Sequence, residues 1–278
     1  MVHFRTEKVS DTITRIFGTS GELWYLVQGS EKAALLDTGS GLGHMKPLIS
    51  ELTDKPLIIL LTHGHVDHAM GATEFDCPIY MNSADDAVYE EHKPFAKRAE
   101  GLCMVPPEVR DAIEDSDYIP YRTEPFLPLN HGDIFDLGGV TIEAYRCPGH
   151  TPGSMVFLMR EERTVLLGDA CNFFTFMFFS YCTPIETFRK NLITLREQLA
   201  GKFDRVLLSH GDGNAPVSII DGVIGVCEDI MNGKADDVPF SFMGEPAVIA
   251  KAVAGPGARA DGGIGNIVYN TANIWEKG

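Results

Sequence analysis

The sequence has 278 residues, of which 44% are hydrophobic and 22% are charged, as in an ordinary folded protein. This length allows either one large domain or two. There are 39 Asp and Glu residues against 23 Lys and Arg, which gives a formal net charge of -16. Because phosphate binding depends on Lys and Arg, this acidity argues against nucleic acid and anionic membranes as partners.

The six cysteines are scattered along the chain without a CxxC pair, which gives no sign of a disulfide framework. The first residues lack an apolar signal region, and no apolar run approaches the length of a transmembrane helix. We therefore expect a cytoplasmic protein with free thiols.

The N-terminal region is predicted to form three strands, at 12–17, 24–28 and 33–36, separated by glycine-rich turns. The third strand leads directly into Asp37. Such a carboxylate either caps the turn or orients a metal-binding imidazole, and the second interpretation gains from the motif that follows. A short helix is expected over 42–51.

The most informative stretch follows the apolar run 57–61, which is predicted to be a buried strand. Six consecutive residues then contain three histidines and an aspartate: His63, His65, Asp67 and His68. A polar surface loop is the alternative, but nothing in packing calls for such crowding. Imidazoles and carboxylates are ligands of zinc and neighbouring metals, so this stretch predicts a metal site.

The following residues are predicted to form a short helix at 69–75 and a strand at 78–81. Residues 83–130 then read as an inserted helical segment, with a charged helix over 83–98 and a second helix over 106–114. This insertion carries no motif of its own. A lid over the site, a subunit contact and a peripheral decoration remain open alternatives.

Two further candidate ligands follow predicted strands in the second half of the chain. The strand pair 133–137 and 140–146 leads to His150 in a loop rich in Pro and Gly. Strands at 155–159 and 165–167 lead to Asp169. The aromatic run that comes next, 171–182, is either core or an apolar wall, and we expect a substrate pocket that includes Asn172, Phe173 and Phe176.

The last part of the chain is predicted to contain two helices and two strands. Thr183 at N-cap, Pro184 at N1 and Glu186 at N3 indicate the start of a helix that ends at Gly201. A strand at 205–208 leads to His210, a helix follows at 217–231, and the glycine-rich tail has one strand-like run, 267–269.

All the candidate ligands come just after apolar strands, so they converge if those strands end at a shared sheet edge. Seven ligands are too many for one tetrahedral ion and suit two ions that share a bridge. The seven are His63, His65, Asp67, His68, His150, Asp169 and His210.

The order of these motifs resembles the metallo-β-lactamase superfamily: Asp-Thr-Gly, HxHxDH, Pro-Gly-His-Thr-Pro-Gly-Ser, Gly-Asp and Ser-His-Gly, between Asp37 and His210. The resemblance implies an α/β fold, a four-layer αββα sandwich in a single domain over 1–278, with the metals at one edge of its two sheets. It implies the following roles: His63, His65 and His150 bind one ion, Asp67, His68 and His210 bind a second, Asp169 bridges, and Asp37 orients a ligand.

A metal-bridging hydroxide would then be the nucleophile, because metal binding lowers the pKa of water from 15.7 to about 7. Asp67 or Asp169 would accept the proton. Two divalent ions are expected, zinc first, with iron or manganese as alternatives.

Three departures from related families narrow the reaction. His65 stands where flavodiiron proteins carry Glu. Asp169 is present, whereas true β-lactamases of the superfamily lack the bridging carboxylate. Asn172 replaces a Tyr that is frequent in quorum-quenching lactonases. We expect hydrolysis of a carboxylic ester, lactone or thioester; a phosphodiesterase with the same dinuclear site, or a mononuclear iron persulfide dioxygenase, is the alternative. The expected partner is a small-molecule substrate, and a homodimer stays open.

Overall fold

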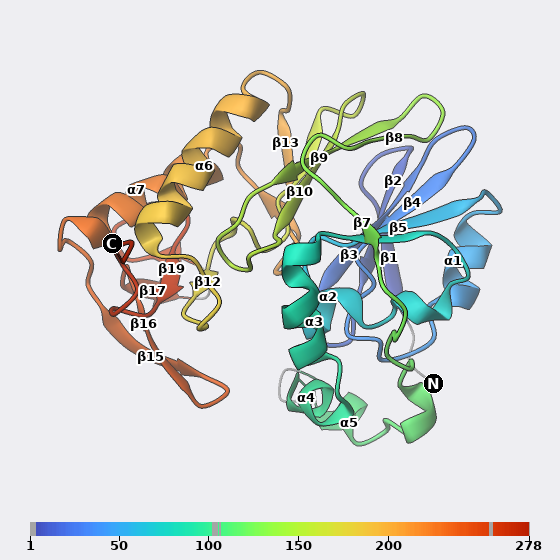
Figure 1. Ribbon diagram of the computed structural model, residues 1–278, viewed down its shortest axis with the longest axis horizontal. Coiled ribbons are helices and arrows are strands. Elements are labelled where there is room, and N and C mark those ends of the chain that lie inside the picture. Colours follow the sequence, from blue (N-terminus) through green and yellow to red (C-terminus); the bar gives the residue numbers. More distant parts are fainter. Residues whose placement is uncertain (1–3, 102–104, 106, 256–257, 278) are drawn as a thin grey trace.

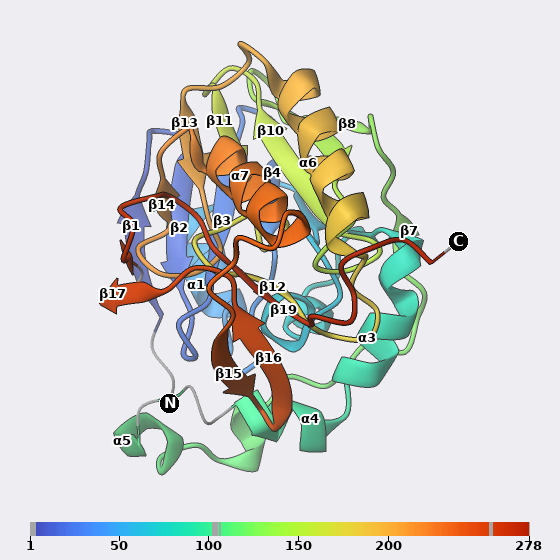
Figure 2. The same cartoon turned by 90° about the vertical axis from the view of Figure 1, so that its left-hand side faces the viewer.

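The computed structural model describes residues 4–101, 105, 107–255 and 258–277. Two β-sheets lie back to back, and helices cover the outer face of each (Figures 1 and 2). The predicted α/β fold, a four-layer αββα sandwich, is therefore confirmed. Within the described residues, none of the helices combines the length and apolar character needed to cross a bilayer.

The first sheet has seven strands in sequence order, antiparallel from β1 to β4 and parallel from β4 to β7. The strands are β1 (Arg5–Lys8), β2 (Ile13–Phe17), β3 (Leu23–Gln28), β4 (Ala33–Leu36), β5 (Leu57–Leu60), β6 (Ile79–Met81) and β7 (Leu127–Pro128). The apolar runs thus mark the central strands to within a residue at each end.

The second sheet has the strand order β14-β13-β11-β10-β9-β8. Its strands are β8 (Ile134–Asp136), β9 (Thr141–Arg146), β10 (Met155–Met159), β11 (Thr164–Leu166), β13 (Arg205–Leu207) and β14 (Asn214–Ala215). Strands β9, β11 and β13 run in the same direction, because β10 is antiparallel to both β9 and β11 and β13 is parallel to β11.

Apolar side chains fill the space between the two sheets. Tyr25 and Leu36 from the first sheet pack in one cluster with Phe157 and Leu166 from the second, and all four are fully buried. Burial of large apolar side chains contributes about 1.5–3 kcal/mol each, so this layer holds the strand ends in fixed positions.

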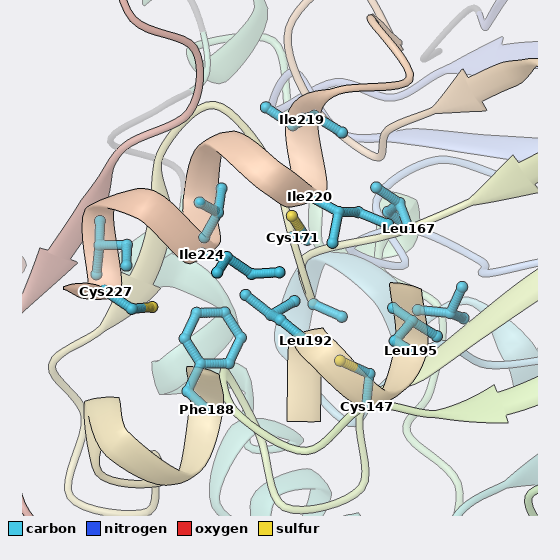
Figure 3. Packing of buried hydrophobic residues seen from close by; sticks show 14 of the residues in the cluster. Cys147, Leu167, Cys171, Phe188, Leu192, Leu195, Ile219, Ile220, Ile224 and Cys227 are labelled. Carbon is cyan, nitrogen blue, oxygen red and sulfur yellow. The ribbon is translucent and has the colours of Figure 1, made fainter. Parts of the chain in front are cut away.

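The helices pack on the outer faces of the sheets. The α-helices are α1 (Lys46–Leu52), α2 (Val66–Ala69), α3 (Asp86–His92), α4 (Phe95–Glu100), α5 (Pro107–Arg110), α6 (Ile185–Leu199) and α7 (Ile219–Met231). Short 3-10 turns are η1 (Ala72–Glu74), η2 (Ser83–Asp85) and η4 (Asp115–Asp117). Ile49 of α1 and Tyr89 of α3 pack on the first sheet. On the second sheet, Figure 3 shows Phe188 and Leu192 of α6 facing Ile224 of α7.

Three sequence expectations about helices were wrong in their bounds. The helix predicted over 83–98 is broken into η2, α3 and α4, because Pro94 lacks a backbone N–H and is extended, with a ψ of 141°. Helix α6 begins one residue later than predicted, with Pro184 as its N-cap and no side-chain capping bond from Thr183. The helix expected over 106–114 is shorter, Pro107–Arg110, and residue 106 lies outside the described residues.

The C-terminal tail contains more structure than the single strand predicted for it. It forms a two-stranded ribbon, β17-β18, and joins β12, a strand from before α6, in a four-stranded sheet in the order β12-β19-β16-β15. These strands are β12 (Thr175–Met177), β15 (Val238–Phe242), β16 (Glu245–Ile249), β17 (Val253–Gly255), β18 (Ala258–Arg259) and β19 (Ile267–Tyr269). The β15–β16 hairpin was not predicted because it contains Pro239 and Pro246, and proline argues against a strand except at the edge of a sheet.

Candidate metal centre

Strand ends place the predicted ligands at one edge of the sandwich. Strand β5 ends at Leu60, and the loop after it carries His63 and His65. His65 is the N-cap residue of α2, so the helix begins at Val66 rather than at residue 69 as predicted. Its first turn holds Asp67 and His68 on a rigid element. His150, Asp169 and His210 leave the ends of β9, β11 and β13, three strands that run in the same direction.

The structure brings all seven predicted ligands together in overlapping groups of three. In each group, one ligand atom from every residue lies within 4.8 Å of the others. The groups are His63, His65 and His150; Asp67, His68 and His210; and His63, His68 and Asp169.

Asp169 lies between the first two groups. Its Oδ2 is 3.8 Å from His150 Nε2, 3.7 Å from His68 Nε2 and 3.2 Å from His210 Nε2. A single carboxylate oxygen therefore faces ligands of both groups, which is the placement that a bridging carboxylate requires.

The ring nitrogens that face away from the centre are tied to the protein, which fixes the orientation of four imidazoles. The pairs are His63 Nδ1 with Thr62 Oγ1 at 3.0 Å, His65 Nε2 with Tyr181 OH at 2.7 Å, His68 Nδ1 with Asp37 Oδ2 at 2.8 Å, and His150 Nδ1 with the Phe176 carbonyl at 2.6 Å. His63, His68 and His150 thus offer Nε2 to the centre, and His65 offers Nδ1.

Asp37 orients His68 as the sequence suggested. Its carboxylate also accepts hydrogen bonds from the backbone N–H and the hydroxyl of Thr62, both at 2.7 Å. Asp37 has a φ of 65°, a left-handed conformation that a residue other than glycine rarely adopts. Such strain persists only where the surroundings determine the conformation, as these three bonds do here.

The electrostatics of the cluster suit a divalent cation. Burial and the neighbouring imidazoles lower the pKa of His63 and His65 well below the ordinary value, so both rings are neutral and have a free lone pair. The Nε2 atoms of His63 and His68 are buried and have no hydrogen-bond partner among the described residues. An unsatisfied buried polar atom costs about 1–3 kcal/mol, and a bound metal ion would satisfy both.

The second group carries the negative charge. Burial opposes ionisation of His210, but the carboxylates of Asp169 and Asp67 raise the pKa of its imidazole to about 9. The pKa of His68 is likewise raised well above its usual range, against the effect of burial, by Asp67 and Asp37. Two carboxylates close to two imidazoles form a site that attracts a cation. These residues therefore fit the divalent ions expected from the sequence.

One buried residue that sequence analysis missed joins the two ligand loops. The carboxylate of Asp85 accepts hydrogen bonds from Gly64 N at 2.9 Å, Thr151 Oγ1 at 2.7 Å and Gly153 N at 2.5 Å. Asp85 follows β6, which is parallel to β5, so it leaves the same edge of the first sheet. That strand-end position is the signal that could have found it.

Tyr181 and His92 were also missed, because no local pattern marks them. The His92 ring stacks on that of His65, with centroids 4.6 Å apart and an interplanar angle of 17°. Its Nε2 lies 3.4 Å from Tyr181 OH. His92 belongs to α3 in the segment 83–130, so part of that segment contacts a predicted ligand directly.

A pocket of about 500 Å³ opens over the cluster. Its floor includes His65, Asp67, His150, Asp169 and His210. The three residues predicted for the substrate pocket, Asn172, Phe173 and Phe176, all line it. So do Phe179, Phe242 and Met243, of which the last two come from the β15–β16 hairpin.

Comparisons with known proteins give the family and the fold. A sequence profile described as the metallo-beta-lactamase superfamily matches residues 18–210. Among solved structures, the metallo-beta-lactamase FIM-1 from Pseudomonas aeruginosa, in a mono-zinc form, has a TM-score of 0.60 at 14% identity, covering 82% of this chain and 96% of that one. A metallo-beta-lactamase from Pontibacter korlensis gives 0.59 at 16% identity, covering 80% and 98%. At these identities the likeness concerns the fold alone.

Curated relatives match part of the chain. An uncharacterized protein of Mycobacterium tuberculosis is 32% identical over 49% of this chain and 61% of the relative. The hydroxyacylglutathione hydrolase GloC of Haemophilus influenzae is 29% identical over 52% and 64%. An atrochrysone carboxyl ACP thioesterase of Aspergillus chevalieri is 27% identical over 55% and 41%. Each match spans less than two thirds of the relative's own length.

Proposed function

This chain belongs to the metallo-beta-lactamase superfamily, and on that premise we propose that it is a metal-dependent hydrolase of a carboxylic ester, lactone or thioester. One observation carries the proposal. Ligand atoms of seven residues converge at the floor of an apolar pocket, and two of their imidazole nitrogens are buried without a hydrogen-bond partner in the part of the chain that the structure describes.

The proposed metal ligands form two subsites. His63, His65 and His150 hold one divalent ion, Asp67, His68 and His210 hold the other, and Asp169 serves both. Zinc is the first choice for such a set, while iron and manganese accept the same donors. A bound divalent ion supplies an activated water and a Lewis acid for the carbonyl oxygen.

The residues of the chain supply the proton transfers and the orientation. Hydrolysis breaks the bond between the acyl carbon and the leaving oxygen or sulfur, and the acyl carbon takes its new oxygen from water. The carboxylates of Asp67 and Asp169 are the proposed acceptors of the water proton, which then passes to the leaving group. Both line the pocket floor, where a substrate carbonyl would lie.

The pocket supports an acyl compound with an apolar part. Phe173, Phe176 and Phe179 form one of its sides. Two of the relatives are named as a hydroxyacylglutathione hydrolase and an ACP thioesterase, and the second name makes thioesters the first substrates to try.

The cations of the pocket do not favour a phosphate diester. Among the described residues that line the pocket, the basic side chains are Lys97 and Arg98. Lys97 Nζ pairs with Glu100 at 2.8 Å. The Arg98 guanidinium donates to the carbonyls of Ser40, Gly41 and Ile119. Both charges are therefore already engaged within the protein.

A substrate panel tests the proposal on metal-replete protein. The panel contains acyl thioesters, acyl lactones, aryl esters and a phosphate diester, with Asp169→Asn as the inactive variant and the exposed Asp54→Asn as the matched control. We expect turnover of an acyl compound that Asp169→Asn abolishes and Asp54→Asn preserves.

The other outcomes point to different reactions. Activity confined to the phosphate diester would contradict the proposal and indicate a phosphodiesterase. If the whole panel is inert, oxygen uptake with a persulfide, together with one iron per chain, would indicate the dioxygenase instead.

A further inference from the structure

We propose that the β15–β16 hairpin is a substrate-binding wall, which selects uncharged acyl groups with a bulky apolar body through Phe242 and Met243. This inference rests on the proposed hydrolase function, since it names the substrate class of the same site. It goes further because it assigns specificity to a segment outside the region that the superfamily profile matches, residues 18–210.

The turn of the hairpin is tight and well defined. Phe242 pairs with Glu245, so only Met243 and Gly244 lie between the strands. Their φ values are 50° and 86°, the left-handed pair of a type I′ turn, whose twist matches that of the flanking strands. The turn therefore holds Met243 in a defined position at the tip.

Strand alternation directs the phenylalanines of β15 to one face. Along Val238–Phe242, partly buried residues alternate with exposed ones, and Phe240 and Phe242 belong to the partly buried set. Their rings meet Phe176, with centroid distances of 6.1 Å and 5.2 Å respectively. These distances lie in the range of favourable aromatic pairs. The hairpin is therefore docked on the aromatic wall of the pocket.

The tip of the hairpin extends past the sheet to which it belongs. Strand β16 pairs with β19 only at Val248 and Ile249, so the end near Glu245 has no further neighbour in the sheet. Figures 1 and 2 show β15 and β16 projecting in this way, toward the side where α4 lies. Phe242, Met243 and Glu245 line the pocket, whose floor is the proposed metal centre.

The chemistry of this wall defines the ligand. Met243 is 41% exposed, and a flexible thioether at a pocket rim adapts to apolar groups of different shape. The polar residues Ser20 and Ser40, with Lys97, line the pocket from the N-terminal half of the chain. The acyl group is accordingly assigned to the hairpin side, and the leaving group to the side that Ser20 and Ser40 line.

Paired substrates and paired variants test the inference. Naphthoyl and acetyl derivatives of one thiol are compared on Phe242→Ala, Met243→Ala and wild-type holoenzyme. Ser241→Ala is the control, because Ser241 lies on the exposed face of the same strand. Phe242→Leu restores an apolar side chain. Independently of turnover, binding of naphthoate to the metal-loaded and the chelator-treated protein is followed by the fluorescence of the probe.

We expect Phe242→Ala to lower kcat/KM for the naphthoyl substrate by roughly tenfold or more, mainly through KM, with little change for acetyl. Phe242→Leu should recover most of the loss, and Ser241→Ala should match the wild type. Phe242→Ala should also weaken the binding of naphthoate, both in the metal-loaded and in the chelator-treated protein. Equal losses for both acyl groups, or unchanged naphthoate binding in Phe242→Ala, would overturn the inference.

The two proposals fail separately. If no ester or thioester is hydrolysed, the hydrolase proposal falls, while weakened naphthoate binding in Phe242→Ala would still identify the hairpin as a binding wall. If hydrolysis is rapid but indifferent to Phe242 and Met243, the hydrolase proposal stands and the hairpin is not a specificity element.

Discussion

The carboxylate of Asp85 and the hydroxyl of Thr151 are joined by a buried hydrogen bond of 2.7 Å. The same carboxylate accepts the N–H groups of Gly64 and Gly153. One loop carries His63 and the other His150, so a residue that is not itself a proposed ligand sets the distance between the two halves of the first subsite. The centre is built across the two sheets of the sandwich rather than within one.

Asp85→Asn should destabilise the fold. The carboxylate accepts three hydrogen bonds. The side-chain amide of Asn has one oxygen that can accept, and its NH2 group would face N–H or O–H groups of the loops, which are also donors. Each buried N–H left without a partner costs about 1–3 kcal/mol. We expect a fall of that size in the free energy of unfolding measured in urea. Asp86→Asn, at an exposed neighbouring position, should lie close to the wild type, and equal stability of the two variants would contradict this role.

Tyr181→Phe should weaken metal binding without loosening the fold. The change removes the hydroxyl that accepts the proton of His65 Nε2 but retains the ring, which stacks on Phe179 with centroids 5.4 Å apart. Loss of such a partner typically costs 10–100-fold in affinity, and we expect roughly that loss in zinc affinity by competition with a chromophoric chelator.

Tyr145→Phe is the matched control for this variant. It also removes a tyrosine hydroxyl, one that bonds Glu143 and Lys202 instead of a ligand. Its zinc affinity should equal that of the wild type. If Tyr181→Phe binds zinc equally well, the tyrosine has no part in orienting His65.

Removal of metal should lower the stability of the protein. Without a cation, His63 Nε2 and His68 Nε2 remain unsatisfied. A ligand that binds only the folded state at 100 times its Kd adds about 2.7 kcal/mol. We therefore expect a lower Tm after chelation and recovery on return of zinc. Asp169→Asn should reduce this shift and Asp54→Asn should preserve it; a Tm that is indifferent to chelator would argue against the metal centre.

The cysteine thiols should react slowly at neutral pH. Burial, with a contribution from Asp76, raises the pKa of Cys77 to about 11. Only the thiolate is nucleophilic. The rate of Cys77 alkylation should therefore rise about tenfold for each unit of increase in pH, as long as the pH stays below this pKa. Cys171, two residues after Asp169, is fully buried, and burial raises the pKa of its thiol well above the usual range. Iodoacetamide labelling with peptide mapping tests both, and fast labelling of either thiol at pH 7 would contradict them.

The strands, and the meeting of the proposed ligands at one edge, were predictable because each depends on local sequence. Apolar runs gave β4 without error and β5 to within one residue, and a polar residue after each run marked the edge where His63, His150 and His210 meet. Residues that act only through long-range contacts leave no such trace. Tyr181 bonds His65, 116 positions away, and belongs to no motif.

The missed hairpin has a different cause. Pro239 and Pro246 lower the strand propensity of β15 and β16 as read locally. Strand β15 lies at the edge of its sheet, and β16 pairs with β19 only beyond Pro246, so both prolines are tolerated where they stand. Tertiary context thus outweighs the low strand propensity of these residues. For the same reason, sequence analysis did not predict that the hairpin lines the pocket.

Phe176 takes part in the centre through its backbone and in the pocket through its ring. Its carbonyl oxygen receives His150 Nδ1, and any amino acid at this position offers the same oxygen. Exchange of the side chain therefore leaves this contact with the imidazole in place. On the proposed function, we expect a substitution at this single codon to change the substrate preference while the metal centre persists, so that a new substrate range is one mutational step away.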